Sequence, residues 1–253
     1  MKIIAISNQK GGVGKTTTTV NLAASFVNMK KKVLLIDLDP QGNATSGGGI
    51  NKSQIQHSIY DVLIGDISLN KIILKSEESF FDIAPANQDL AGAEIDLVGI
   101  QDREYTLKNA INALKKSYDY ILIDCPPTLN LLTVNALVAA TAVLIPMQCE
   151  YYALEGLSDL VNTIKRVKKQ LNPKIEIEGL LRTLFDKRNT LAQQVSDELS
   201  SHFGSKVYKT IIPRNVRLAE APSHGKAALF YDKSSKGAKA YLALAEEMLR
   251  GNA

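Results

Sequence analysis

The chain has 253 residues, of which 45% are hydrophobic, and this suits one large α/β domain over residues 1–253. A net charge of +4 is compatible with an anionic partner, and the longest apolar runs, such as 136–145, are too short to cross a membrane. The first residues carry no cleavage site typical of a signal peptide, and two cysteines are too few for a disulfide framework. We therefore expect a cytoplasmic protein with reduced thiols.

Apolar strand-like runs alternate with helical patterns along most of the chain. The runs that predict strands lie at 2–7, 32–39, 80–86, 118–127, 142–148, 177–185 and 206–212. Apolar residues at helical spacing predict helices at 15–29, 58–65, 104–117, 129–140, 153–171, 190–202 and 235–249, whereas 40–49 is loop by composition. Near-continuous apolar strands between amphipathic helices predict a doubly wound, mostly parallel sheet flanked by helices.

The first predicted strand runs into the glycine-rich stretch SNQKGGVGKTTTT at 7–19. Such a loop before a helix leaves backbone N–H groups free to bind a polyphosphate, and glycines let the backbone approach it closely. Lys15 would then reach the outer phosphates, and the Thr16 hydroxyl would bind Mg²⁺. The predicted nucleotide contacts are Lys10, Gly11, Gly12, Val13, Gly14, Lys15, Thr16 and Thr17. The pattern departs from an ordinary phosphate loop, which has glycine where Gln9 stands and needs no second lysine at position 10.

Aspartates end two further predicted strands. Asp37 and Asp39 follow the apolar run that begins at residue 32, and one of them could hold the hydration shell of a metal while the other orients an attacking water. Asp124 closes the run YILID, which has the form of a Walker B strand whose carboxylate reaches Mg²⁺ through water. Because ligands bind beyond the carboxyl ends of parallel strands, we expect these carboxylates to lie beside the glycine loop.

Taken together, KGGVGKTTT, DLDPQGNAT and DCPP resemble the motifs of the deviant Walker family of dimerising P-loop ATPases. The stretch TIIPRNVRLAEAPSHGK at 210–226 is similar to the ParA/Soj branch, the chromosome- and plasmid-partition ATPases. The resemblance covers nearly the whole chain. It implies a P-loop fold, Mg²⁺-dependent ATP hydrolysis, and a homodimer in which two subunits enclose two ATP molecules.

The resemblance also implies residue roles. Lys10 would cross the dimer to the phosphates of the partner's nucleotide, and Lys15 would bind those of its own. Asp39 would position or activate the hydrolytic water and, with Thr16 and Asp124, support the metal. The remaining implied contacts are Asn43 in a switch segment that senses the γ-phosphate, and Pro213 and Asn215 against the adenine.

Membership of that branch further implies that the ATP-bound dimer binds double-stranded DNA without sequence preference. Arg188 and Arg217 best match the positions that would contact DNA, in a C-terminal half rich in lysine and arginine. Contacts to DNA phosphates need no base readout, and each adds about one unit to the salt dependence of binding. No residue of the loop serves as an arginine finger, so we expect slow hydrolysis that a ParB-type centromere-binding protein stimulates. A nucleoid-associated cytoplasmic location follows.

Two rival functions carry different signatures. A MinD-like membrane-cycling ATPase of division-site placement would end in a basic amphipathic helix, but YLALAEEMLRGNA, with two glutamates, favours helix packing and no membrane contact. A relative of the nitrogenase iron protein would present thiolates at a dimer axis, whereas Cys125 and Cys149 lie in apolar strand-like contexts. His57, His202 and His224 have no metal-ligand spacing.

Overall fold

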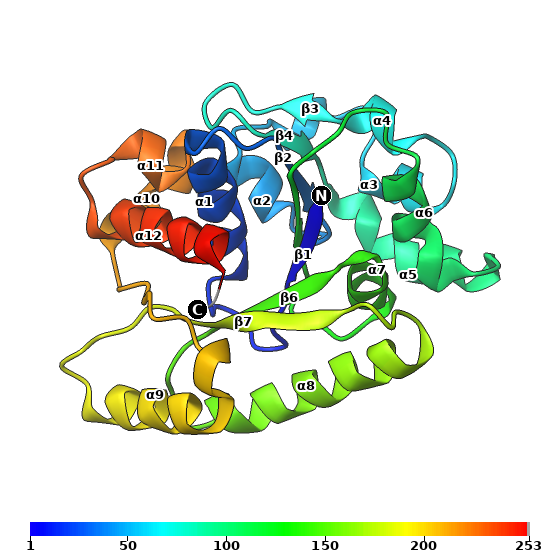
Figure 1. Cartoon of the computed structure of the whole chain (residues 1–253). Coiled ribbons are helices and arrows are strands. Elements are labelled where there is room, and N and C mark those ends of the chain that lie inside the picture. The colour runs from blue at the N-terminus through cyan, green and yellow to red at the C-terminus, as the bar shows by residue number, and fades with distance from the viewer. Residues whose placement is uncertain (252–253) are drawn as a thin grey trace.

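A seven-stranded sheet forms the centre of the computed structural model, which describes residues 1–251, and helices cover both of its faces (Figure 1). The strand order is β3-β4-β2-β5-β1-β6-β7. The strands are β1 (Lys2–Ile6), β2 (Val33–Asp37), β3 (Leu74–Lys75), β4 (Asp82–Ala84), β5 (Tyr120–Asp124), β6 (Ala142–Met147) and β7 (Glu176–Arg182). Within the described residues, β3 pairs antiparallel with β4 and the other neighbours pair in parallel. The prediction of a doubly wound, mostly parallel sheet is confirmed.

The connection that leaves β1 sets the position of the candidate site. β1 lies between β5 and β6, with Ile6 opposite Asp124 on one side and opposite Leu144 on the other. The chain then crosses β5 to form β2, so the carboxyl ends of β1, β2 and β5 meet at one edge of the sheet. A crevice between connections that diverge in this way is where open α/β sheets bind ligands.

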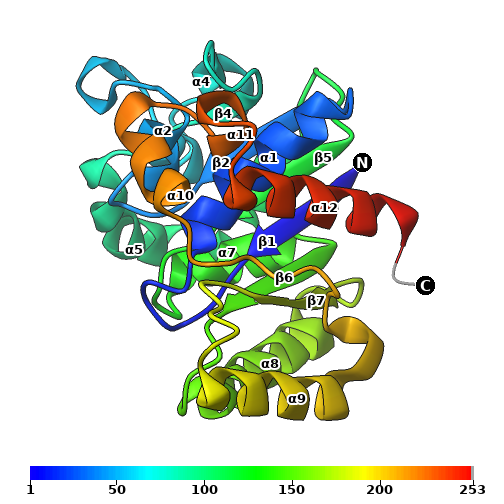
Figure 2. The ribbon, with the colours of Figure 1, turned by 90° about the vertical axis from the view of Figure 1, so that its left-hand side faces the viewer.

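The two faces of the sheet bury separate cores. One core contains Ile4, Phe26 and Leu244 and is covered by α1 (Lys15–Asn28), α2 (Asn43–Gly47), α10 (Val216–Glu220), α11 (Ala228–Tyr231) and α12 (Lys236–Arg250). The opposite core is covered by α3 (Ile59–Leu63), α4 (Leu69–Ile72), α5 (Ala93–Asp96), α6 (Thr106–Asn112), α7 (Leu131–Ala139), α8 (Ala153–Gln170) and α9 (Thr190–Phe203). Figure 2 shows α12 lying alongside α1.

The structure corrects the prediction that residues 40–49 are loop. Residues Asn43–Gly47 form α2, which begins directly after Gly42. Gly42 has φ 60°, and a Cβ there would come within 2.8 Å of the Ala86 carbonyl oxygen, so only glycine fits this turn. The glycine-rich composition that suggested loop therefore supplies the tight turn that starts a short helix.

The predicted strand at 206–212 is also wrong. This segment contributes one isolated bridge, between Val207 and Leu180, and no ladder. Instead, the carboxylate of Glu247 on α12 accepts hydrogen bonds from the backbone N–H groups of Lys209 (2.7 Å) and Thr210 (2.9 Å). Because a side chain from a distant helix takes up these donors, they are not available to a neighbouring strand.

Both cysteines are buried, as the sequence predicted. Cys125 is 1% exposed and Cys149 is 6% exposed. Burial raises the pKa of Cys149 to about 11 and also raises the pKa of Cys125. Buried, protonated thiols of this kind do not favour the iron–sulfur alternative, which needs exposed thiolates.

Candidate active site

The glycine loop connects β1 to α1 at the carboxyl edge of the sheet. Its start is tied to β6, because the Asn8 side chain donates to the Pro146 carbonyl (2.8 Å) and accepts from the Lys10 N–H (3.0 Å). Its end is Gly14, which has φ 86° and begins α1 without a side-chain cap. In the described structure the first turn of α1 holds no acidic residue. Its free N–H groups and the helix dipole therefore favour a bound anion.

Lys15 lies folded over this loop. It is 7% exposed, and its Nζ donates to the Lys10 carbonyl oxygen at 3.1 Å. Burial lowers the pKa of Lys15, although Asp124 and Asp39 act in the opposite direction. A buried ammonium that has lost part of its hydration gains most from a nearby anion. The geometry suits the predicted contact between Lys15 and a phosphate.

Thr16 and Asp124 are brought together, as predicted, and Thr19 joins them. Thr16 Oγ1 donates to Asp124 Oδ2 at 2.7 Å, and Thr19 Oγ1 donates to Asp124 Oδ1 at 2.9 Å. A hydroxyl that gives its proton to a carboxylate presents its lone pairs elsewhere, as a cation requires. Burial, with a smaller contribution from Asp37, raises the pKa of Asp124 to about 8. This pair is suited to a hydrated Mg²⁺, which keeps most of its waters.

The two aspartates after β2 differ in what they contact. Asp37 is fully buried and accepts from Thr45 N (2.8 Å), Thr45 Oγ1 (2.7 Å) and Asp39 N (3.1 Å). The prediction that both carboxylates line the edge of the site is therefore wrong for Asp37, which fastens α2 to β2. Asp39 is 9% exposed, and its Oδ1 accepts from Gln41 N at 3.0 Å. Asn43 is the first residue of α2 and is exposed.

A pocket of about 240 Å³ adjoins the loop. It is lined by Gly12, Gly14, Thr17, Thr183, Leu184, Ile212, Asn215, Leu218, Ala219 and Tyr241. Asn215 Oδ1 is buried there without a hydrogen-bond partner, which leaves an acceptor for a ligand that carries an N–H group. A Cβ added at Gly11 or Gly12 would meet nothing within 4 Å, so the loop leaves room for a ligand at its face. The pocket, the loop and the free acceptor fit a purine nucleotide with its phosphates.

Pro213, which was expected beside Asn215 at the adenine, lines a different pocket of about 880 Å³. Basic side chains dominate that second pocket: Lys187, Arg188, Lys209, Arg214, Lys236 and Lys239 line it, with Asp186. We call this surface the basic pocket. Arg188 is 90% exposed and pairs with Asp186 at 2.8 Å, and it lowers the pKa of Asp186 to about 2.

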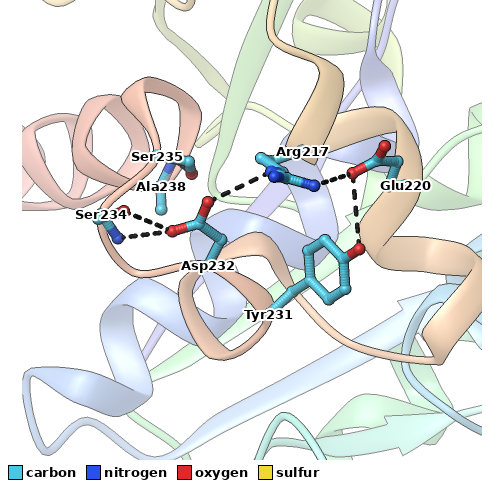
Figure 3. Close-up of polar contacts among 7 residues, drawn as sticks. All are labelled: Arg217, Glu220, Tyr231, Asp232, Ser234, Ser235 and Ala238. Atoms are coloured by element: carbon cyan, nitrogen blue, oxygen red, sulfur yellow. Dashed lines mark hydrogen bonds and ion pairs between the residues drawn. The ribbon is translucent and has the colours of Figure 1, made fainter.

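Arg217 lies on α10, is not among the residues that line the basic pocket, and contacts two acids. Its guanidinium is 2.7 Å from Glu220 and 3.3 Å from Asp232 (Figure 3). Tyr231 donates to the same Glu220 carboxylate at 3.5 Å. The predicted DNA contacts Arg188 and Arg217 are thus each paired within the chain, which the sequence did not indicate. Exposed pairs of this kind are weak because solvent screens them, so either arginine can exchange its partner for a phosphate.

Lys10 and Lys15 have opposite environments. The Lys10 side chain is 44% exposed and forms an ion pair with Glu150 at 2.5 Å. Glu150 is itself 48% exposed, so the pair lies at the surface. Sequence reasoning missed Glu150, which lies 140 residues further along the chain. It also missed Thr19, Thr45 and Thr183; a polar residue at the end of a buried strand, as in LLRTLF, is the signal that could have indicated Thr183.

Metal ligands do not form a dense cluster at this edge. Within residues 1–251, no three side chains of His, Cys, Asp or Glu converge as a metal-binding group. Thr16 and Asp124 are in contact, whereas Asp39 contacts the backbone of its own turn. The predicted set of Thr16, Asp39 and Asp124 therefore stays a prediction.

The chain is similar to proteins of one known family. A family model described as an AAA domain matches residues 1–177. The chain is 57% identical to the sporulation initiation inhibitor protein Soj of Bacillus subtilis, over 98% of both chains. It is 52% identical to the chromosome partitioning protein ParA of Myxococcus xanthus, over 98% of this chain and 88% of that one. The chain belongs to the ParA/Soj family of chromosome-partitioning ATPases. The predicted family is confirmed.

A solved structure agrees with the ParA/Soj assignment of the fold. The cobyrinic acid a,c-diamide synthase of Mycobacterium smegmatis, solved with a bound ATP analogue and magnesium, superposes with a TM-score of 0.86 at 37% identity. The match covers 99% of this chain and 95% of that one. The P-loop architecture expected from the sequence is therefore confirmed.

The C-terminal helix of this ParA/Soj protein is packed as part of a core. On α12, Tyr241, Leu244, Ala245 and Met248 are buried in the same core as α1. The apolar face that a membrane-binding helix would need is therefore already covered. In residues 1–251, no helix is long and apolar enough to span a bilayer.

Proposed function

We propose that this chain is a DNA-partitioning ATPase of the ParA/Soj kind, which binds ATP with Mg²⁺, dimerises on it, and then binds double-stranded DNA without sequence preference. Hydrolysis, stimulated by a ParB-type centromere-binding protein, would release the DNA and so drive the segregation of a chromosome or plasmid. A nucleoid-associated protein of the cytoplasm is the corresponding location. Residues 1–253 would form one domain, and the last two of them lie outside the described residues.

One observation carries the proposal: a single loop holds one buried lysine and one exposed lysine. Lys15 is 7% exposed and is directed over its own loop, whereas 44% of the Lys10 side chain is exposed, at the surface. Two lysines serving the same nucleotide would both be expected to lie within the loop. A lysine held at the surface is available to a nucleotide of a second subunit, whose charge it would offset. This division supports the roles assigned to Lys10 and Lys15.

The other site residues would act on the same nucleotide. The loop N–H groups and Lys15 would hold the phosphates, and Asn215 Oδ1 would accept from the exocyclic amine of the adenine. Thr16, with Asp124 behind it, would hold the cation, and Mg²⁺ would neutralise charge on the phosphates. Asp39, at the end of its turn, would orient the hydrolytic water, and Asn43 at the start of α2 would sense the outer phosphate. Pro213 lines the basic pocket, two residues before Asn215, and would border the adenine from the side of that pocket.

The basic pocket and Arg217 support the DNA-binding part of the proposal. A surface with six basic side chains and one acid would attract a polyanion at any sequence. Doubling the surface in a dimer multiplies the affinity through effective concentration, so DNA binding would depend on ATP. The MinD-like alternative is less favoured, because α12 buries its apolar face within the protein.

Charge removal at Arg188 or Arg217 tests this interface. With a non-hydrolysable ATP analogue, Arg188→Ala and Arg217→Ala should each weaken binding to several unrelated duplexes by a similar factor. Each should also lower the slope of log affinity against log salt by about one unit, because one phosphate contact is lost. Fluorescence anisotropy on labelled duplexes measures the affinity and the salt slope. The salt concentration would run from about 50 to about 300 mM, which brackets physiological ionic strength.

Arg166→Ala provides the matched control, because Arg166 is exposed on α8 and does not line the basic pocket. It should leave the affinity and the salt slope unchanged. A loss confined to one duplex sequence would contradict contact with the DNA backbone. Wild-type protein that binds equally well with ADP or without nucleotide would contradict the proposed function itself.

A further inference from the structure

Thr183 follows β7, and its side chain contacts the glycine loop. Its Oγ1 donates to the Val13 carbonyl oxygen at 2.7 Å, across 170 residues of sequence. Thr183 is 2% exposed, and an added Cβ on Gly14 would lie 3.9 Å from both its Cβ and its Cγ2. We infer that Thr183 is a positioning residue of the phosphate loop, which holds the Val13–Gly14 peptide in the orientation that binds anions. This inference rests on the proposed binding of ATP.

The geometry of a single peptide plane explains the effect. The peptide is trans, so the Val13 carbonyl and the Gly14 N–H point in opposite directions. A carbonyl fixed on Thr183 therefore turns the N–H away from Thr183 and toward the open face of the loop. If the plane flipped, a carbonyl dipole would face the phosphates where an N–H should be, and anion binding would weaken.

The plane needs such an anchor because Gly14 permits the flip. Gly14 has φ 86°, and glycine adopts positive and negative φ with similar ease. The Val13 side chain is 1% exposed and keeps this part of the loop buried. A buried carbonyl without a donor is costly, so the Thr183 hydroxyl selects one orientation of the plane.

Thr183 is itself held firmly. The Thr183 N–H donates to the Met147 carbonyl at 2.9 Å. Two residues further on, the Phe185 N–H donates to the Ile212 carbonyl at 3.1 Å. Between them, Leu184 has φ 50°, a left-handed conformation that a side-chain-bearing residue rarely adopts. The chain thus turns sharply after Thr183 and ends β7 with the hydroxyl against the loop.

Calorimetric titration of a non-hydrolysable ATP analogue with Mg²⁺ into the full-length protein tests the inference. Thr183→Val keeps the shape of the side chain and removes the donor, and it should weaken binding roughly tenfold, as expected for one lost hydrogen bond. Thr183→Ser keeps the donor and should bind within roughly threefold of wild type. If the valine variant does not fold, Thr183→Ala against Thr183→Ser makes the same comparison.

Thr141→Val separates positioning from stability. The Thr141 hydroxyl donates to the Ile3 carbonyl at 2.9 Å and accepts from the Ile3 N–H at 3.0 Å, at the opposite edge of the sheet, so this variant loses two hydrogen bonds of its hydroxyl. Thr141→Val should lower the melting temperature at least as much as Thr183→Val does, yet only Thr183→Val should weaken binding. Equal binding by Thr183→Val and wild type would overturn the inference. Wild-type protein that does not bind the analogue would instead overturn the proposed function.

Discussion

Lys15→Ala is expected to abolish ATP binding, with affinity reduced roughly a hundredfold or more, as for loss of a charge-assisted contact to phosphate. Lys15 is the buried cation of the loop, and its Nζ lies 3.1 Å from the Lys10 carbonyl oxygen. Burial lowers the pKa of Lys15, because the buried ammonium has lost part of its hydration. A bound phosphate would replace those lost interactions with water. Calorimetric titration with ATP and Mg²⁺ measures the loss.

The control for this variant is Lys71→Ala, since Lys71 is an exposed lysine on α4. It should bind ATP as the wild type does. Circular dichroism on both variants shows whether the fold is retained, which matters because Asp124 lies close enough to Lys15 to alter its pKa. If folded Lys15→Ala binds ATP with an affinity within roughly threefold of wild type, the assigned role is contradicted, because a loss of affinity of roughly a hundredfold is expected.

Asp39→Ala is expected to stop turnover while leaving the binding of ATP and of DNA intact. A residue that orients the attacking water contributes roughly a hundredfold or more to the rate. Asp39 has this position because its carboxylate follows β2 and accepts from Gln41 N at 3.0 Å. Phosphate release under single-turnover conditions, together with nucleotide affinity, separates the two effects.

Asp39→Asn sharpens the comparison, because an amide oxygen can still accept from Gln41 N but carries no charge. If Asp39 acts on water, Asp39→Asn should be as slow as Asp39→Ala. If Asp39 only shapes the turn, Asp39→Asn should recover most of the rate. Asp159→Ala, at an exposed acid of α8, should hydrolyse ATP normally. Loss of DNA binding in Asp39→Ala would contradict the role in hydrolysis.

The sequence predicted the sheet and the loop because both depend on local patterns. Apolar runs marked the buried strands, and glycines before a threonine-rich helix marked the phosphate loop. The helix predicted at 235–249 is α12, and the two cysteines are buried as expected. These features need no knowledge of which segments meet in three dimensions.

Features that depend on distant contacts were not predictable in this way. The segment 206–212 has strand-like composition, but Glu247 of α12 binds its backbone donors. Asp37 and Asp39 look equivalent along the chain, yet Thr45 takes up the Asp37 carboxylate. The ion pairs of Lys10 with Glu150 and of Arg217 with Asp232 join segments that are distant in the sequence, and composition does not reveal them.

Nucleotide-dependent dimerisation through Lys10 is the central claim, and sedimentation velocity tests it most directly. Wild type and Lys10→Ala are compared with a non-hydrolysable ATP analogue and Mg²⁺, with ADP, and without nucleotide. Wild type should be a dimer only with the analogue. Lys10→Ala should still bind the analogue but stay a monomer, because no lysine then offsets the partner's phosphates. A wild-type monomer in all three conditions, or a Lys10→Ala dimer that hydrolyses ATP at the wild-type rate, would contradict the account.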